Sequence, residues 1–166
     1  MHMSMEGNLR KRGFVLAGFA TVLLATTASA IAQNSEQKSP VFSVETAKWN
    51  SPYDGPLGIP KGAQAATLGI DPVTGGETYY ARFPAGSHFE LHWHTHDEHA
   101  LVVSGKGSLT LGAERHSLAE GNYVVIPGKV PHEWNVDARR ELILLVRRAG
   151  PTDFNFVKDA APAKLP

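Results

Sequence analysis

The sequence predicts an all-β domain, a sandwich or a barrel, for most of the chain. Short apolar or alternating runs recur along it, and most are followed by glycine, proline or aspartate, which is the rhythm of strands and turns. Beyond the N-terminal region, no stretch has the periodicity of a long helix. The 166 residues fit one domain. The absence of cysteine excludes disulfides, thiolate metal ligands and cysteine nucleophiles.

Several runs are assigned to strands because they alternate or are continuously apolar and stop at turn residues. They are AATLGI (65–70), ETYYARF (77–83), HALVVS (99–104), SLTLG (108–112), NYVVI (122–126), ELILLV (141–146) and FNFV (154–157). The preceding segment, 51–62, contains three prolines and three glycines and is expected to form a loop.

The N-terminal region has the features of a secretory signal peptide. A basic patch, 10–12, precedes an uncharged run, and the most apolar part of that run, 13–25, has the length of a signal-peptide core. Small residues around Ala30 and Ala32 fit cleavage after either one. An uncleaved anchor is the alternative, because the run approaches the roughly 20 residues that span a bilayer. Its Thr-, Ser- and Ala-rich second half favours cleavage, and we expect an exported protein, periplasmic or secreted.

These features divide the chain into a signal peptide (1–32), an N-terminal extension and loop (33–61), a β-barrel (62–157) and a flexible tail (158–166). The chain has 16 basic and 16 acidic residues, which gives zero net charge. This balance favours neither nucleic acid nor an anionic membrane as a partner. After signal cleavage, neither of these partners is expected.

The segment 92–99, HWHTHDEH, contains four of the eight histidines and two carboxylates. Alternate residues of a strand share a face, so His92 and His94 point to the same side and can converge on one metal ion. Glu98 follows across a short bend, where its carboxylate can provide a third ligand. A fourth must come from elsewhere in the chain. His132 is the candidate, because it follows a stiff turn that can direct its side chain into a barrel.

The spacing of this cluster resembles the first motif of the cupin superfamily. That motif is a glycine, five residues, His-x-His, three residues, Glu, six residues and a glycine. The chain matches every fixed position, at Gly86, His92, His94, Glu98 and Gly105.

A second region is similar to the second cupin motif, at Gly121, Pro127 and His132. The second glycine of that motif falls on Lys129, while the chain has Gly128 one place earlier. The asparagine of the motif falls on Val136, while Asn135 lies one place earlier. We expect Pro127 and Gly128 to form a type II turn despite these departures.

The resemblance covers roughly residues 62–157 and implies a double-stranded β-helix, the jelly-roll barrel of cupins. It also implies one divalent transition metal, with ligands His92, His94, Glu98 and His132. Neutral imidazole binds iron, manganese, nickel, copper and zinc, so the identity of the metal stays open.

Other polar residues near the cluster have less defined roles. His96 and His99 are expected to be exposed at a bend. His88 and Glu90 share the predicted face of the ligands and are either rim residues or partners of the ligands. A ligating histidine usually has its second ring nitrogen held by a neighbour. The candidates for this are Asp97, Glu90 and Glu133.

The candidates for a substrate pocket are Tyr80, Arg82, Glu90 and Trp134. If Arg82 points inward, its guanidinium can bind a carboxylate, and if it points outward it is a solvated charge. Trp134 shares the predicted face of His132. It can stack on a substrate, plug the barrel, or pack in the core.

An open coordination position distinguishes a catalytic metal from a structural one. The resemblance implies a metal-dependent enzyme on a small organic molecule, with dioxygenase- or isomerase-like chemistry and no catalytic residue yet assigned. The alternative is a non-catalytic metal or small-molecule binding module. A homodimer is also expected, unless the N-terminal segment covers the same outer face. That face consists of Phe89, Leu91, Leu101 and Val103.

Overall fold

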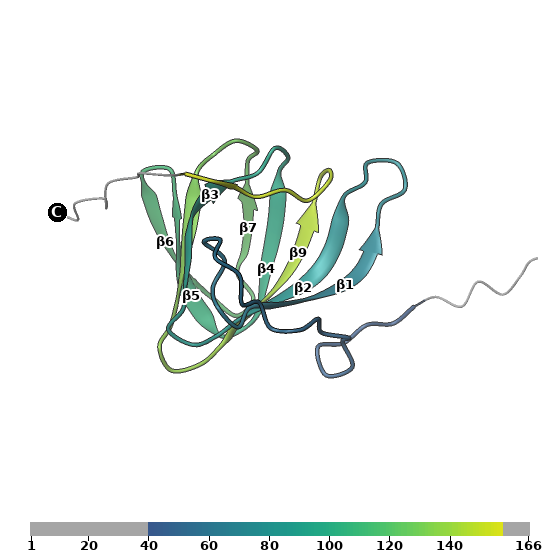
Figure 1. Ribbon diagram of the computed structural model, residues 1–166, viewed down its shortest axis with the longest axis horizontal. Helices are drawn as coiled ribbons and strands as arrows, with labels where there is room; N and C mark the ends of the chain where they lie inside the picture. Colours follow the sequence, from purple (N-terminus) through teal and green to yellow (C-terminus); the bar gives the residue numbers. More distant parts are fainter. Residues whose placement is uncertain (1–39, 158–166) are drawn as a thin grey trace, which may run out of the picture. The chain divides into compact units, whose positions relative to one another are not determined.

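The computed structural model describes residues 40–157, which form ten strands in two five-stranded antiparallel sheets (Figure 1). The strands are β1 (Gln64–Ile70), β2 (Glu77–Phe83), β3 (His88–Trp93), β4 (Glu98–Ser104), β5 (Lys106–Leu111), β6 (Glu114–Ala119), β7 (Tyr123–Ile126), β8 (His132–Val136), β9 (Leu142–Arg148) and β10 (Asn155–Phe156). The expected signal peptide, 1–32, and tail, 158–166, lie outside the described residues. In the described part, no helix is long and apolar enough to cross a membrane.

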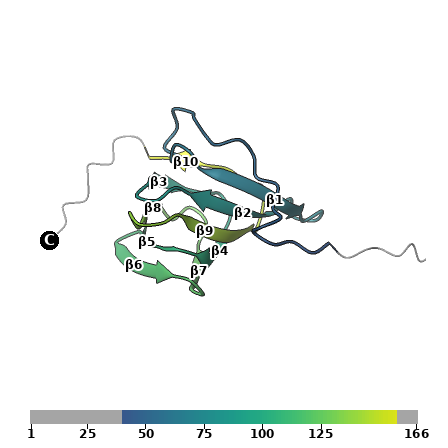
Figure 2. The ribbon, with the colours of Figure 1, turned by 90° about the horizontal axis from the view of Figure 1, so that it is seen from below.

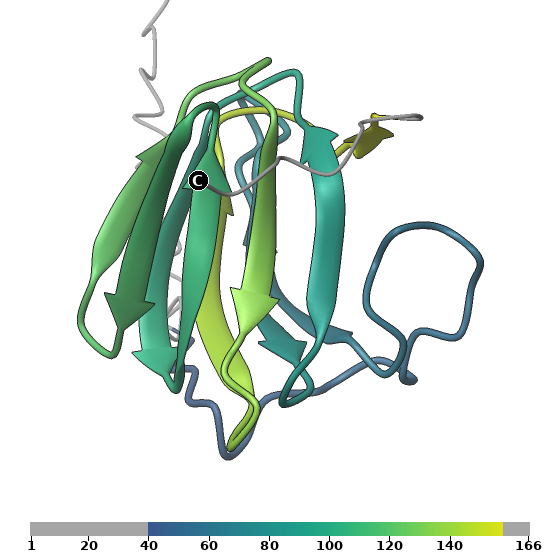
Figure 3. The same cartoon turned by 90° about the vertical axis from the view of Figure 1, so that its left-hand side faces the viewer.

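The two sheets form the two layers of a jelly-roll barrel. One sheet has the order β1-β2-β9-β4-β7 and the other β10-β3-β8-β5-β6. Figures 2 and 3 show these two layers and the loops that gather at their ends. Several neighbouring strands are distant in the sequence, because β9 lies between β2 and β4, and β8 lies between β3 and β5. This arrangement confirms the predicted all-β barrel class.

The core is built from the inward faces of both sheets. Strand β9 lies in the middle of the first sheet and is buried along most of its length, as its continuous apolar sequence predicts. Several core side chains are at most 1% exposed, namely Ala66, Ala100, Val102, Leu109, Ile126, Leu142 and Leu144. Full burial of one leucine contributes about 1.5–3 kcal/mol. This apolar core gives the barrel the stability to hold polar groups in its interior.

Strand β6 gives no apolar signal in the sequence, because its residues, ERHSLA, are mostly polar and exposed. It is an edge strand that pairs with β5 along its whole length in a hairpin. Backbone hydrogen bonding to β5 therefore determines that this segment is a strand, and burial of its side chains contributes little to its stability.

Strand β3 departs from the regular alternation that the sequence predicts. Phe89 lies opposite Trp134 and His92 lies opposite His132, so β3 has one residue more than β8 between these two pairs. This bulge places Phe89 and His92 on the same inner side, 6% and 1% exposed. The predicted outer position of Phe89 is therefore wrong. The other members of the expected outer face are half-buried, namely Leu91, Leu101 and Val103.

Gly105 connects β4 to β5 at a place where no side chain fits. Its φ is +86°, and a Cβ there would collide with the carbonyl oxygen of Glu141. Replacing Gly105 with alanine is expected to lower the free energy of unfolding by about 2–4 kcal/mol, from left-handed strain and overpacking. Urea denaturation measures this loss.

Gly112 is the matched control, because its φ is +57° and a Cβ there would have no heavy atom within 4 Å. Gly112→Ala is expected to lower the free energy of unfolding by only about 1 kcal/mol, because it adds left-handed strain and no collision. Equal losses in the two variants would contradict the assigned role of the Glu141 carbonyl.

Candidate metal centre

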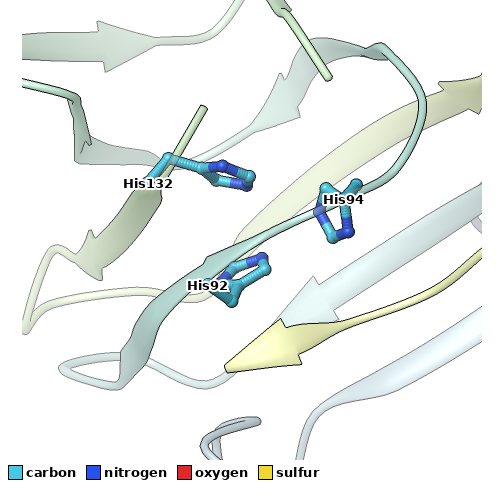
Figure 4. Close-up of side chains that lie close together, drawn as sticks. All are labelled: His92, His94 and His132. Carbon is cyan, nitrogen blue, oxygen red and sulfur yellow. The ribbon is translucent and has the colours of Figure 1, made fainter. Parts of the chain in front are cut away.

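Three histidines meet inside the barrel. His92 lies in β3, His94 follows the end of β3, and His132 begins β8 directly opposite His92. Their exposures are 1%, 3% and 0%. One ring nitrogen from each lies within 4.8 Å of the others, and Figure 4 shows the three rings turned toward one shared space. The structure therefore brings together three of the four predicted ligands as one buried group.

Backbone carbonyls hold the outer nitrogen of each ring. The Nδ1 atoms of His92, His94 and His132 donate to the carbonyls of Glu90 (2.7 Å), Asp153 (2.5 Å) and Val130 (3.0 Å). A carbonyl only accepts, so each neutral ring carries its proton on Nδ1 and presents a lone pair on Nε2. This is the tautomer that a metal ligand requires.

Two inner nitrogens of the group make no hydrogen bond with any described residue. Nε2 of His94 and Nε2 of His132 are buried and make no hydrogen bond. Nε2 of His94 also lies 2.9 Å from a carboxylate oxygen of Glu98. Two lone-pair-bearing atoms this close repel unless a cation or a proton lies between them. The donor set and its unsatisfied nitrogens therefore fit a divalent transition metal.

Burial keeps two of these imidazoles, those of His92 and His132, in the neutral form that binds metal. Burial lowers the pKa of His92 to about 3, and repulsion from His132 adds to the shift. Burial also lowers the pKa of His132. Both rings are thus neutral near pH 7, and metal does not have to displace a proton from either Nε2.

Glu98 lies beside the histidine group and is held by a buried arginine. It begins β4, directly opposite Arg148 at the end of β9, and its carboxylate lies 2.7 Å from Nη1 of Arg148. Burial would raise the pKa of Glu98. The charge of Arg148 and the contact with His94 outweigh burial and lower the pKa to about 2. Glu98 is therefore an anion next to the site, and its role as the fourth ligand stays a prediction.

A cavity of about 230 Å³ lies beside His92 and Glu98. Its walls are mainly apolar, and Trp134 is among them. Tyr79, Ala81 and Phe83 of β2 also line it. This alternation turns the neighbouring side chains of β2 away from the cavity.

The other three predicted pocket residues do not line the cavity. Arg82 packs over the ring of Trp49, 4.0 Å from the centroid, and lies 3.5 Å from Glu141. Tyr80 lies on the same side of β2 and contacts Trp49. Glu90 is exposed, because the β3 bulge turns it outward. The assignment of these residues to the pocket is corrected accordingly.

The predicted orienting carboxylates also act elsewhere. Asp97 accepts a hydrogen bond from the backbone N–H of Gly128 at 2.7 Å. Glu133 lies 3.7 Å from exposed His88 on the outer side of the sheet. Glu90 contributes its backbone carbonyl, and not its carboxylate, to His92. His96 is exposed, as expected. Backbone carbonyls, and not these carboxylates, orient the rings of the three buried histidines.

The turn before His132 differs from the expected one. It runs from Pro127 to Val130, and its left-handed residue is Lys129, with a φ of 66°. Gly128 precedes this position, and a Cβ there would lie 2.7 Å from the carbonyl oxygen of Thr95. Glycine is thus needed at 128 for close backbone approach, while Lys129 accepts the strained conformation.

Four important residues were missed in the sequence, namely Tyr79, Arg148, Asp153 and Phe154. Arg148 could have been found from alternation along β9, because Leu144, Val146 and Arg148 share one buried face. Asp153 had no signal, because it acts through its backbone carbonyl on His94 and through its carboxylate on Thr95.

Comparison with known proteins agrees with the observed fold. Residues 79–146 match the family model of the cupin domain. A cupin-2 domain protein of Rhodospirillum rubrum has the same fold, with 20% identity, a TM-score of 0.60, and coverage of 74% of this chain and 82% of that chain. A cupin 2 conserved barrel domain protein of Rhodopseudomonas palustris is 21% identical, with a TM-score of 0.59 and coverage of 69% and 79%.

A curated enzyme also matches over a short stretch. The chain is 44% identical to quercetin 2,3-dioxygenase of Bacillus subtilis over 57 residues, which is 33% of this chain and 17% of that enzyme. The chain therefore spans a small part of that relative. Residues 79–146 therefore resemble the cupin domain, and the two solved structures share the fold. The three buried histidines have the chemistry of a metal site.

Proposed function

We propose that this protein is a metal-dependent enzyme acting on a small organic molecule. Dioxygenase-like chemistry is the preferred reaction class, and isomerase-like chemistry is the second candidate. The observation that carries the proposal is the group of buried imidazoles with unpartnered nitrogens beside an apolar cavity. The similarity to quercetin 2,3-dioxygenase supports the first reaction class.

The histidines and the cavity have separate roles in this proposal. His92, His94 and His132 would hold the metal, with Glu98 as the predicted fourth ligand. A divalent transition metal bound there supplies Lewis-acid or redox chemistry at the edge of the cavity. The apolar walls exclude water from a bound molecule and strengthen electrostatic interactions inside.

Tyr79 contributes a proton donor to the cavity. It is buried, and burial raises its pKa to about 12 against the opposing charge of Arg148. Its hydroxyl therefore keeps its proton near pH 7 while accepting hydrogen bonds from Arg148 at 2.9 and 3.2 Å. The proton on Oη is free to be donated to an oxygen of a bound molecule.

Trp134 bears on the alternative, a non-catalytic binding module. A tryptophan that filled the barrel against the histidines would favour a structural role. Trp134 is 2% exposed and forms part of the cavity wall, and about 230 Å³ stays open beside it. The open space supports an enzyme more than a closed module.

Elemental analysis and turnover test the proposal together. The protein is purified without a histidine tag, analysed for iron, manganese, nickel, copper and zinc, and reconstituted with each. Oxygen consumption and NMR detection of isomers are then followed with a panel of small enols, phenols and carboxylic acids. We expect turnover with at least one metal and none in a His132→Ala variant. Stoichiometric metal without turnover across the panel would favour the binding module.

A further inference from the structure

Arg148 is one of two charged groups in a mainly apolar wall. Among the described residues that line the cavity, Glu98 and Arg148 are the ones that carry a formal charge. The side chain of Arg148 is 3% exposed, and its guanidinium lies 5.5 Å from the ring centroid of Phe154. A cation in such a place requires anionic partners, because burial of an unpaired charge is costly.

The hydrogen bonds of Arg148 leave part of its guanidinium available. Nε and Nη2 donate to the hydroxyl of Tyr79, which holds one edge of the group in place. Nη1 forms an ion pair with a carboxylate oxygen of Glu98 at 2.7 Å. Nη1 carries two N–H groups, so this single contact leaves at least one of them without an acceptor among the described residues. An unsatisfied donor buried at a cavity wall is a binding element for an acceptor that enters the cavity.

The charge balance at this end of the cavity also favours an anion. Glu98 neutralises Arg148 in the protein as it stands. The three histidines are neutral ligands, so a divalent metal on them would leave the region with a net positive charge. A monoanionic molecule would reduce that charge, whereas a neutral molecule would not.

We propose that the substrate is a compact, mostly apolar molecule with one ionised oxygen group, a carboxylate, enolate or phenolate, and that Arg148 binds this group. The proposal rests on the metal-dependent function above and adds the substrate class to it. The apolar body of the molecule packs against aromatic side chains of the wall, including Phe83, Phe89 and Trp134. Arg148 is thus a specificity-determining residue.

Calorimetric titration of the zinc-loaded protein tests this without turnover. The probes are benzoate and benzamide, which share a shape and differ in charge. We expect benzoate to bind at least tenfold more tightly than benzamide. This comparison uses the unmodified protein and does not depend on the folding of a variant.

Arg148→Lys keeps a positive charge beside Glu98 and removes the planar fork. We expect this variant to bind benzoate about tenfold more weakly, with unchanged benzamide affinity and unchanged zinc stoichiometry. Arg147→Lys is the matched control, because Arg147 is the exposed neighbour on the same strand, and its benzoate affinity should not change.

Two outcomes would overturn the assignment of Arg148. Equal affinity for the two probes in the zinc-loaded protein would remove the anion preference. Loss of zinc together with benzoate in Arg148→Lys would show that Arg148 only supports the metal site. Failure of the unmodified protein to bind zinc or another divalent metal would instead contradict the proposed function, so the two failures are distinguishable.

Discussion

Replacing His94 with alanine is expected to remove bound metal almost completely. His94 provides one of three buried ring nitrogens that lie within 4.8 Å of one another, and its Nδ1 is already fixed by a backbone carbonyl. Loss of a residue that merely orients a ligand costs about 10–100-fold in metal affinity. Loss of the ligand itself should cost more than about 100-fold. Elemental analysis after dialysis and competition with a chelator measure the change.

His96→Ala is the matched control for this prediction. His96 lies two residues further along the same segment, and its side chain is exposed and outside the histidine group. Metal content should stay at the level of the unmodified protein. Comparable metal content in both variants would mean that the histidines of this segment bind metal non-specifically and form no single site.

Breaking the buried pair of Glu98 and Arg148 should destabilise the metal-free protein strongly. The two side chains are 6% and 3% exposed and lie 2.7 Å apart, so Arg148→Met leaves a carboxylate in the interior without its main partner. Removal of one member of such a pair costs about 3–5 kcal/mol. Chemical denaturation in the presence of a chelator measures this loss.

The pH dependence of this loss gives an independent check. The pKa of Glu98 is lowered from 4.5 to about 2, so the pair contributes its full stability above pH 4.5 and loses it as the pH falls through about 2. The difference in free energy of unfolding between the unmodified protein and Arg148→Met should therefore narrow on acidification.

The double variant Glu98→Gln, Arg148→Met should be more stable at pH 7 than Arg148→Met alone. A double variant that is no more stable would show that the stranded charge is not the cause.

The sequence was sufficient to predict the group of three histidines because most of its signal is local. One residue separates His92 from His94, and the rest of the first motif has fixed spacing. His132 could be inferred because few histidines lie elsewhere in the chain and a stiff turn precedes it. Register then explains why they meet, since β3 and β8 pair with His92 opposite His132.

The pocket residues were harder to predict because strand alternation holds only while a strand is regular. Trp134 lies on the inner side with His132, since β8 has no irregularity at that position, and its role toward a substrate stays a prediction. Glu90 was placed wrongly because the bulge in β3 shifts the alternation by one residue. For Arg82 the choice between inside and outside depended on which face of β2 meets the core, and strand alternation alone does not decide that.

From its sequence alone, this protein could be assigned an all-β barrel, a metal site on histidines and the absence of thiol chemistry. These three assignments follow from the types of residue present and from spacings of a few residues. Such short spacings keep residues close together in any fold of the chain. Only the tertiary structure places Arg148 against Glu98 and the carbonyl of Asp153 against His94, because these partners are 50 and 59 residues apart and meet through sheet pairing and packing. Long-range contacts of this kind depend on the whole set of strand registers, and no local pattern encodes them.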